Sequence, residues 1–140
     1  MKNRVLLDTG PLVAYLKRQD NFHQWAVQEL EDIQPPVLTC EAVIVEACFL
    51  LKRTYNAQET ILSLLNTGAL QIPFSLSEEA GIIGQLMKHY QSVPMSLADA
   101  CLVRMSELYP GSFLLTLDSD FKINRRNRNQ LIATIMPESL

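Results

Sequence analysis

Four acidic residues interrupt apolar segments of the sequence, where carboxylates are uncommon. The segments read RVLLDTGPLVAYL, EAVIVEACFLL, SLADACLV and SFLLTLDSDF, and the acids within them are Asp8, Glu46, Asp99 and Asp118. Moving a carboxylate out of water costs several kcal/mol unless another group compensates its charge. Four such residues in core-like segments therefore indicate a bound cation, and with it a metal-dependent enzyme.

Three of these acids also have an ordinary structural explanation. Asp8 follows an apolar run and precedes Thr-Gly-Pro, as a helix N-cap or a turn residue often does. Asp99 stands three residues after Ser96, which is the spacing of a capping box. Asp118 and Asp120 fit an Asx turn at the end of a strand. Of this last pair we favour Asp118 as the site residue, because it is closer to the strand, and keep Asp120 as an accessory candidate.

Glu46 is harder to explain by structure alone, because apolar residues flank it on both sides. The alternative is a narrow polar stripe along one helix, on which Glu46 simply faces solvent or is screened by a neighbouring charge. Thr39 and Arg53 stand seven residues to either side of Glu46 and hence on the same helix face, where Arg53 could screen its charge. Glu46 is the one acid whose functional interpretation outweighs the structural one by itself.

Further candidates flank Asp118 in the sequence. Thr116 shares a side of the strand with Asp118 by the period of two, so its hydroxyl could bond a carboxylate or a metal-bound water. The segment KINRRNR that follows is either a solvated loop or a phosphate-binding patch beside the acidic turn. Its basic residues are Lys122, Arg125, Arg126 and Arg128.

Composition limits the class of protein. The chain has 140 residues, with 48% hydrophobic and 19% charged residues, which suits one ordinary domain with a substantial core. Its net charge of −3 argues against a surface that binds nucleic acid everywhere, but it permits a local basic patch. Three cysteines without a CxxC pattern indicate free thiols in a reducing compartment, and no apolar run is long enough for a membrane span. We expect a cytoplasmic protein.

The acids must be positioned by strands that alternate with helices. Short apolar runs at 5–7, 37–38, 70–72, 113–117 and 131–136 predict strands. Helices are predicted at 11–18, 22–33, 40–53, 57–66, 77–90 and 96–108, with Thr39 capping the third, which should be buried on most of its circumference. This alternation predicts a parallel sheet with helices on both faces, and hence sites at the carboxyl ends of the strands.

Taken together, the four motifs, in this order and spacing, resemble the PIN-domain nucleases, and in particular the VapC-type toxins of bacterial toxin–antitoxin pairs. The likeness spans nearly the whole chain. It implies a single α/β domain, residues 1–140, with three α/β/α layers around a short central parallel sheet. It also implies that the four acids converge on Mg²⁺ or Mn²⁺, cations that suit oxygen ligands.

The resemblance further implies hydrolysis of RNA phosphodiester bonds. Asp8 and Asp99 would be the principal metal ligands, Asp118 a ligand or water-orienting acid, and Glu46 a second ligand or base. It implies a cognate antitoxin and a homodimer as partners. The acidic net charge means that RNA must be held locally. The candidates for that patch are Lys52, Arg53, Arg104 and the basic residues between Lys122 and Arg128.

Two alternatives remain open from the sequence. The first is a PIN fold that binds RNA without turnover, which the intact set of four acids disfavours. The second is another magnesium-dependent phosphohydrolase, with Asp8 as its nucleophile. Haloacid-dehalogenase-like phosphatases carry a second Asp two residues after the first, and Gly10 occupies that place here.

Overall fold

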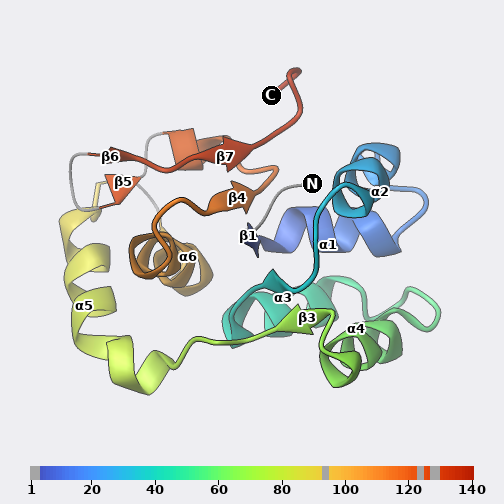
Figure 1. Cartoon of the computed structure of the whole chain (residues 1–140), viewed down its shortest axis with the longest axis horizontal. Coiled ribbons are helices and arrows are strands. Elements are labelled where there is room, and N and C mark those ends of the chain that lie inside the picture. Colours follow the sequence, from blue (N-terminus) through green and yellow to red (C-terminus); the bar gives the residue numbers. More distant parts are fainter. Residues whose placement is uncertain (1–3, 93–94, 123–124, 127–129) are drawn as a thin grey trace.

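A parallel sheet forms the centre of the structure. The computed structural model describes residues 4–92, 95–122, 125–126 and 130–140. Within these residues the sheet has five strands in the order β3-β2-β1-β4-β7, and every pair is parallel (Figure 1). The strands are β1 (Val5–Leu7), β2 (Val37–Leu38), β3 (Leu70–Gln71), β4 (Phe113–Leu115) and β7 (Thr134–Ile135). The fold class predicted from the sequence is confirmed.

The helices form two layers, one on each face of the sheet. They are α1 (Thr9–Leu16), α2 (His23–Glu31), α3 (Glu41–Leu50), α4 (Ala57–Thr67), α5 (Leu76–His89) and α6 (Leu97–Leu108). The chain runs from β1 to β2 to β3 in one direction and then returns across the sheet to β4. Because parallel crossovers are right-handed, α1–α4 and α5–α6 fall on opposite faces. Figure 1 shows α5 and α6 across β1 and β4 from α1 and α2.

The change of direction places a topological switch point between β1 and β4. At such a point the connections leave the two strands toward opposite faces, which opens a crevice beyond their carboxyl ends. The strand residues on either side are apolar and almost fully buried, with Leu6, Leu7, Leu114 and Leu115 each at most 2% exposed. The crevice therefore rests on a fully buried part of the core.

Helix starts differ from the prediction by at most two residues, and the largest difference is at α1, which begins at Thr9 instead of Pro11 because Asp8 caps it. Two other starts show which side chains decide the position. Thr39 does not cap α3; the N-cap is Cys40, and the Thr39 hydroxyl instead donates to the carbonyl of Leu7 at 2.8 Å, which ties the end of β2 to the end of β1. Helix α5 begins one residue before the predicted Ser77, because Ser75 caps it by accepting from the backbone N–H of Glu78 at 3.4 Å. At α3 the Thr39 hydroxyl bonds the sheet instead of the helix end, whereas at α5 two neighbouring hydroxyls, Ser75 and Ser77, could cap the helix and Ser75 does.

The predicted last strand, 131–136, is divided in two. Its first residue pairs in β6 (Gln130–Leu131), antiparallel to β5 (Arg125–Arg126), while β7 joins the main sheet beside β4. A short 3-10 turn, Ser119–Lys122, leads from the Asp118 turn toward this hairpin. In the described part of the chain, no helix is long and apolar enough to cross a membrane.

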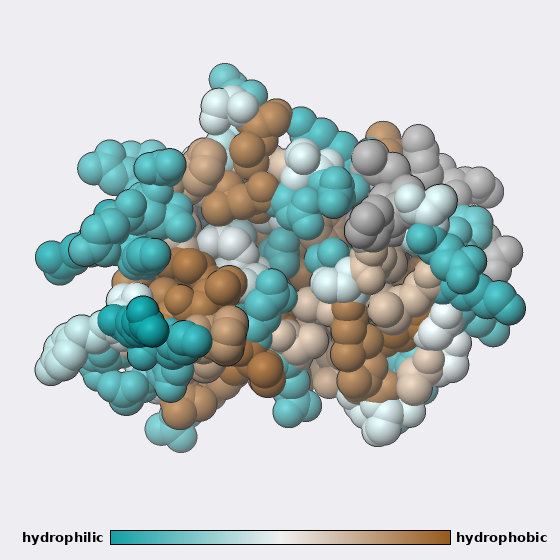
Figure 2. All heavy atoms as spheres, turned by 180° about the vertical axis from the view of Figure 1, so that it is seen from behind, coloured by the Kyte–Doolittle hydropathy of each residue, from teal (hydrophilic) through white to brown (hydrophobic). Residues whose placement is uncertain are grey.

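The prediction that α3 is buried on most of its circumference is wrong. Val43 and Ala47 are buried, but Val45, Phe49 and Leu50 are 69%, 62% and 53% exposed. Apolar side chains gather in patches on the face of the molecule shown in Figure 2. Apolar composition alone could not separate a helix buried in its own core from one with an apolar face left for a partner.

Candidate functional site

Strand pairing brings Asp8 beside Thr116. Leu7 of β1 is in register with Leu115 of β4, so the residues that follow them lie next to each other beyond the strand ends. The ladder continues by one further bond, from the Asp8 N–H to the Leu115 carbonyl at 3.1 Å. Residues more than one hundred positions apart in the sequence thus share one edge of the sheet.

Asp8 is held by two hydrogen bonds. As N-cap of α1 it accepts the Thr9 N–H on Oδ1 at 2.7 Å, and its Oδ2 accepts the Thr116 hydroxyl at 2.6 Å. The Thr116 oxygen in turn accepts the Asp118 N–H at 3.0 Å. Thr116 is fully buried and therefore fixes the orientation of Asp8 relative to the Asp118 turn. Its predicted bond to a carboxylate is present.

Asp99 lies at the N-terminus of α6 in a complete capping box. Its N–H donates to the Ser96 hydroxyl at 3.0 Å, and its Oδ2 accepts the Ser96 N–H at 3.2 Å. The capping explanation is correct, but it does not compete with a place in the site, because Asp99 also lines the cavity described below. The cap fixes the side chain at the helix end.

Glu46 reaches the same region from the middle of α3. Its Oε2 accepts the Thr9 hydroxyl at 3.3 Å, which links α3 to the first turn of α1. Arg53 does not screen it, since the ion pairs found among the described residues are those of Arg104. The expected Arg53 contact is therefore not found, but Glu46 is exposed, as the solvent-facing alternative predicts.

All four acids line one cavity of about 450 Å³, which we call the acidic cavity. Asp120 does not line it; its N–H donates to Asp118 Oδ1 at 2.9 Å and completes the Asx turn. Asp20 does line it, although the sequence analysis did not single this residue out. The complete lining is Asp8, Thr9, Gly10, Val13, Asp20, Phe22, Glu46, Leu50, Asp99, Leu117 and Asp118.

Close packing explains the glycine after Thr9. A Cβ on Gly10 would lie 3.2 Å from the Leu117 Cβ, so the first turn of α1 sits directly against the residue that precedes Asp118. Contacts this short force neighbouring groups to shift. Gly10 therefore allows the helix end and the acidic turn to approach each other.

Burial, with a smaller contribution from neighbouring charges, raises the pKa of two of the acids. Burial raises the pKa of Asp8 from 3.8 to about 6; hydrogen bonds from Thr116 and Thr9 oppose this, and the charges of Asp99 and Asp118 add to it. Burial likewise raises the pKa of Asp99, with the charges of Asp118 and Glu46 contributing. Because none of these acids is ion-paired with a described basic residue, the negative charge of the cavity is uncompensated within the described chain.

The chemistry of the donors fits a hard divalent cation. Carboxylate oxygens without histidine or cysteine suit Mg²⁺ or Mn²⁺, and a cation would offset both the burial and the repulsion that raise the pKa of Asp8 and Asp99. In the part of the chain that the structure describes, no three His, Cys, Asp or Glu residues already stand close enough to hold one ion. Coordination would therefore require side-chain rotation within the acidic cavity.

The predicted basic residues lie in different places. Lys52 and Arg53 line a second cavity next to the acidic one, together with Lys17 and Arg18, which the sequence did not single out because no motif includes them. The Lys122 ammonium donates to the Leu140 carbonyl at 2.8 Å. Arg125 and Arg126 form strand β5, and Arg128 lies outside the described residues.

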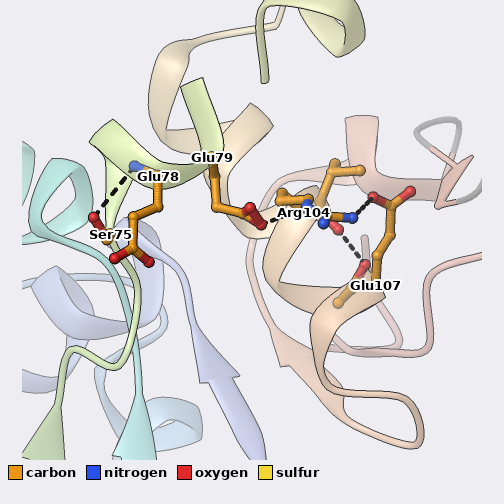
Figure 3. A network of polar contacts seen from close by, with 7 residues as sticks. Ser75, Glu78, Glu79, Arg104 and Glu107 are labelled. Carbon is orange, nitrogen blue, oxygen red and sulfur yellow. Dashed lines mark hydrogen bonds and ion pairs between the residues drawn. The ribbon is translucent and has the colours of Figure 1, made fainter. Parts of the chain in front are cut away.

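Arg104 is not free to bind RNA. Figure 3 shows its guanidinium between two carboxylates, Glu79 of α5 at 2.9 Å and Glu107 of α6 at 3.2 Å. The three side chains are largely buried, with 8–19% of each exposed. Arg104 therefore joins the two helices of one layer, and its inclusion among the RNA-binding candidates is wrong.

Comparisons with known proteins agree with this architecture. The family model described as "PIN domain" matches residues 5–127. The crystal structure of VapC20 from Mycobacterium tuberculosis, described as a toxin that cleaves the sarcin–ricin loop, superimposes with a TM-score of 0.75. The match covers 85% of this chain and 93% of that one at 17% identity. A comparison with curated sequences finds no significant match. Because the family model spans most of its length, the chain belongs to the PIN domain family.

Proposed function

We propose that this PIN domain is a divalent-metal-dependent endoribonuclease that hydrolyses RNA phosphodiester bonds, and that it is the toxin component of a type II toxin–antitoxin system. The observation that carries the proposal is the gathering of Asp8, Glu46, Asp99 and Asp118 around one cavity without a described basic partner. A protein has little reason to maintain such repulsion unless a cation binds there.

Each acid has a distinct proposed role. Asp8 and Asp99 are the principal ligands, because a helix cap holds each of them at the edge of the sheet. Asp118, tied to Asp8 through Thr116, is a further ligand or orients the attacking water. Glu46 is more exposed, and the one hydrogen bond that its side chain makes within the described residues is to the Thr9 hydroxyl, so it is available as a second ligand or as the base.

When bound, Mg²⁺ or Mn²⁺ would make a water nucleophilic near neutral pH and would offset the charge that develops on the phosphate. The protein contributes positioning. The bond from Thr116 keeps Asp8 turned toward the strand ends, and the close contact of Gly10 with Leu117 holds the Asp118 turn against α1. The raised pKa of Asp8 means that protons compete with the cation below about pH 6.

RNA cleavage tests the proposal. Labelled RNA incubated with the protein should be cut in Mg²⁺ or Mn²⁺ and left intact in a chelator. Asp99→Asn should remove cleavage while the protein remains folded. Asp120→Asn is the matched control, since Asp120 is an acid of the same turn as Asp118 that does not line the acidic cavity. Cleavage that survives chelation, or that Asp120→Asn reduces as much as Asp99→Asn, would rule out the proposed metal site.

The partners follow from the same proposal. VapC20 cleaves the sarcin–ricin loop, so an oligonucleotide with that ribosomal sequence is a suitable first substrate for this chain. We propose a cognate antitoxin that silences the enzyme, and a homodimer in which the exposed apolar side chains of α3 are covered. Light scattering on the purified protein tests the homodimer. A mass twice that of the 15.8 kDa chain is expected, and a monomer at all concentrations would refute the dimer.

A binding module without turnover is the remaining competitor. The same cleavage assay, combined with calorimetric titration of Mn²⁺, distinguishes the nuclease from the binding module. Metal binding without hydrolysis of any RNA would favour the module.

A further inference from the structure

A second cavity of about 850 Å³ lies between the ends of α1 and α3. We call it the basic cavity, because four of its nine lining residues are cations and none is an acid. Four of the twelve lysines and arginines in a chain of net charge −3 therefore gather at one place. The lining is Leu16, Lys17, Arg18, Gln19, Leu50, Lys52, Arg53, Thr54 and Tyr55.

The basic cavity adjoins the acidic one. Leu50 lines both, and the consecutive residues Gln19 and Asp20 line one each. A polyanion that entered the acidic cavity would therefore meet four positive charges on one side of it. This arrangement offsets the repulsion that the acids would otherwise exert on a phosphate backbone.

The four cations are available to a ligand. Each is exposed, and none forms an ion pair with another described residue. The Lys52 ammonium lies 4.2 Å from the centre of the Phe49 ring. Cations near helix C-termini also complement the helix dipole, which is the ordinary explanation for Lys17 and Lys52. That explanation does not account for the neighbouring aromatic residue.

Tyr55 is 98% exposed, more than any other large apolar or aromatic side chain among the described residues. It lines the basic cavity next to Arg53 and precedes Asn56, whose positive φ of 59° turns the chain into α4. An aromatic ring held in solvent beside cations is the usual platform on which single-stranded nucleic acids stack a base. Paired bases in a helix cannot present their faces in this way.

We propose that the basic cavity binds the backbone of single-stranded RNA next to the scissile phosphate, with one unpaired base stacked on Tyr55. This inference rests on the proposed nuclease function and extends it to the strand that flanks the cut. Lys17, Arg18, Lys52 and Arg53 bind phosphates, whereas Tyr55 contributes a contact that is independent of salt.

Binding without cleavage tests the inference. The affinity of the wild-type protein for a fluorescent single-stranded RNA is measured by anisotropy in EDTA, over a range of salt concentrations. Tyr55→Ser should weaken binding about 5- to 150-fold, the range for loss of one stacked base, while Tyr55→Phe should retain it. Neutralising Lys52 and Arg53 together to glutamine should lower the slope of log affinity against log salt by about 1.4.

Lys88→Gln is the matched control, because Lys88 is an exposed cation at the end of α5, outside the basic cavity. Thermal melts confirm that every variant is folded. Three results would overturn the inference. The Tyr55→Ser and double-glutamine variants could bind RNA as tightly as the wild type, Lys88→Gln could lose as much affinity as they do, or the wild type could fail to bind RNA. The proposed function fails separately, if the wild type binds RNA but never cleaves it in Mn²⁺.

Discussion

Replacing Asp8 by asparagine should stabilise the metal-free protein while it removes the metal site. In the fold the pKa of Asp8 is about 6 instead of 3.8, chiefly because its side chain is buried. Because the pKa of Asp8 is higher in the folded than in the unfolded protein, the protonated carboxyl stabilises the fold relative to the ionised one. This stabilisation is fully present below pH 3.8 and is lost as the pH rises through about 6. The difference between the two pKa values corresponds to about 3 kcal/mol of unfolding free energy, which is lost by pH 8.

The expected difference can be read from urea unfolding, followed by the fluorescence of the single tryptophan, Trp25. In EDTA, Asp8→Asn should be more stable than the wild type by up to about 3 kcal/mol at pH 8 and nearly equal to it at pH 4. Asparagine fits the site, since the Thr116 hydroxyl can turn to accept from its amide. Mn²⁺ at a hundredfold excess over its dissociation constant should stabilise the wild type by about 2.7 kcal/mol and leave Asp8→Asn unchanged.

Asp120→Asn should be as stable as the wild type both in EDTA and in Mn²⁺, because the Asp120 carboxylate does not line the acidic cavity. A metal-free Asp8→Asn variant that is less stable than the wild type at pH 8 would refute the electrostatic reasoning. Equal stabilisation of Asp8→Asn and wild type by Mn²⁺ would refute the role of Asp8 as a ligand.

Three further perturbations probe the scaffold. Thr116→Val removes a hydrogen bond that lowers the pKa of Asp8, so the acidic limb of the cleavage pH profile should move to higher pH; an unchanged limb would contradict this role for Thr116. Gly84→Ala should raise stability by about 1 kcal/mol in thermal unfolding, because no atom lies within 4 Å of the added Cβ in the middle of α5; a lower melting temperature would show a hidden constraint. Arg104→Met should cost about 1–3 kcal/mol in urea unfolding, because it leaves Glu79 partly buried without its partner, and a neutral result would mean that the ion pair does not join the helices.

Much of the fold was predictable because its local and global signals agree. Short apolar runs followed by helix caps mark buried parallel strands, and four of the five expected strands correspond to single strands of the sheet. The fifth was divided because apolar composition at 131–136 does not reveal that Leu131 pairs with β5 while Ile135 pairs with β4. Which strand a segment pairs with, and in which register, depends on the neighbouring strands in the fold, and the sequence of one segment does not contain this information.

The acidic site was predictable for a different reason. Carboxylates inside apolar segments are costly, so Asp8, Glu46, Asp99 and Asp118 are conspicuous in the amino-acid sequence alone. Asp20 is not, because it lies in a polar loop where aspartate is ordinary, and only the packing of α1 against α2 brings it to the cavity.

The basic cavity illustrates the same limit. Lys17 and Arg18 follow α1, whereas Lys52 and Arg53 follow α3, and no local pattern connects the two pairs. They meet because α1 and α3 pack together in one layer. By contrast, Arg104 resembles a surface cation in the sequence, yet in the fold it is paired with Glu79 and Glu107.

Anomalous diffraction from crystals soaked in Mn²⁺ tests the proposed metal site without relying on activity, because it locates the ion itself. We expect an anomalous peak in the acidic cavity, with carboxylate oxygens of Asp8 and Asp99 roughly 2.1 Å from it, and no such peak in crystals of the Asp99→Asn variant. The absence of a peak in that cavity at saturating Mn²⁺, or a peak that neither Asp8 nor Asp99 contacts, would contradict the proposed site.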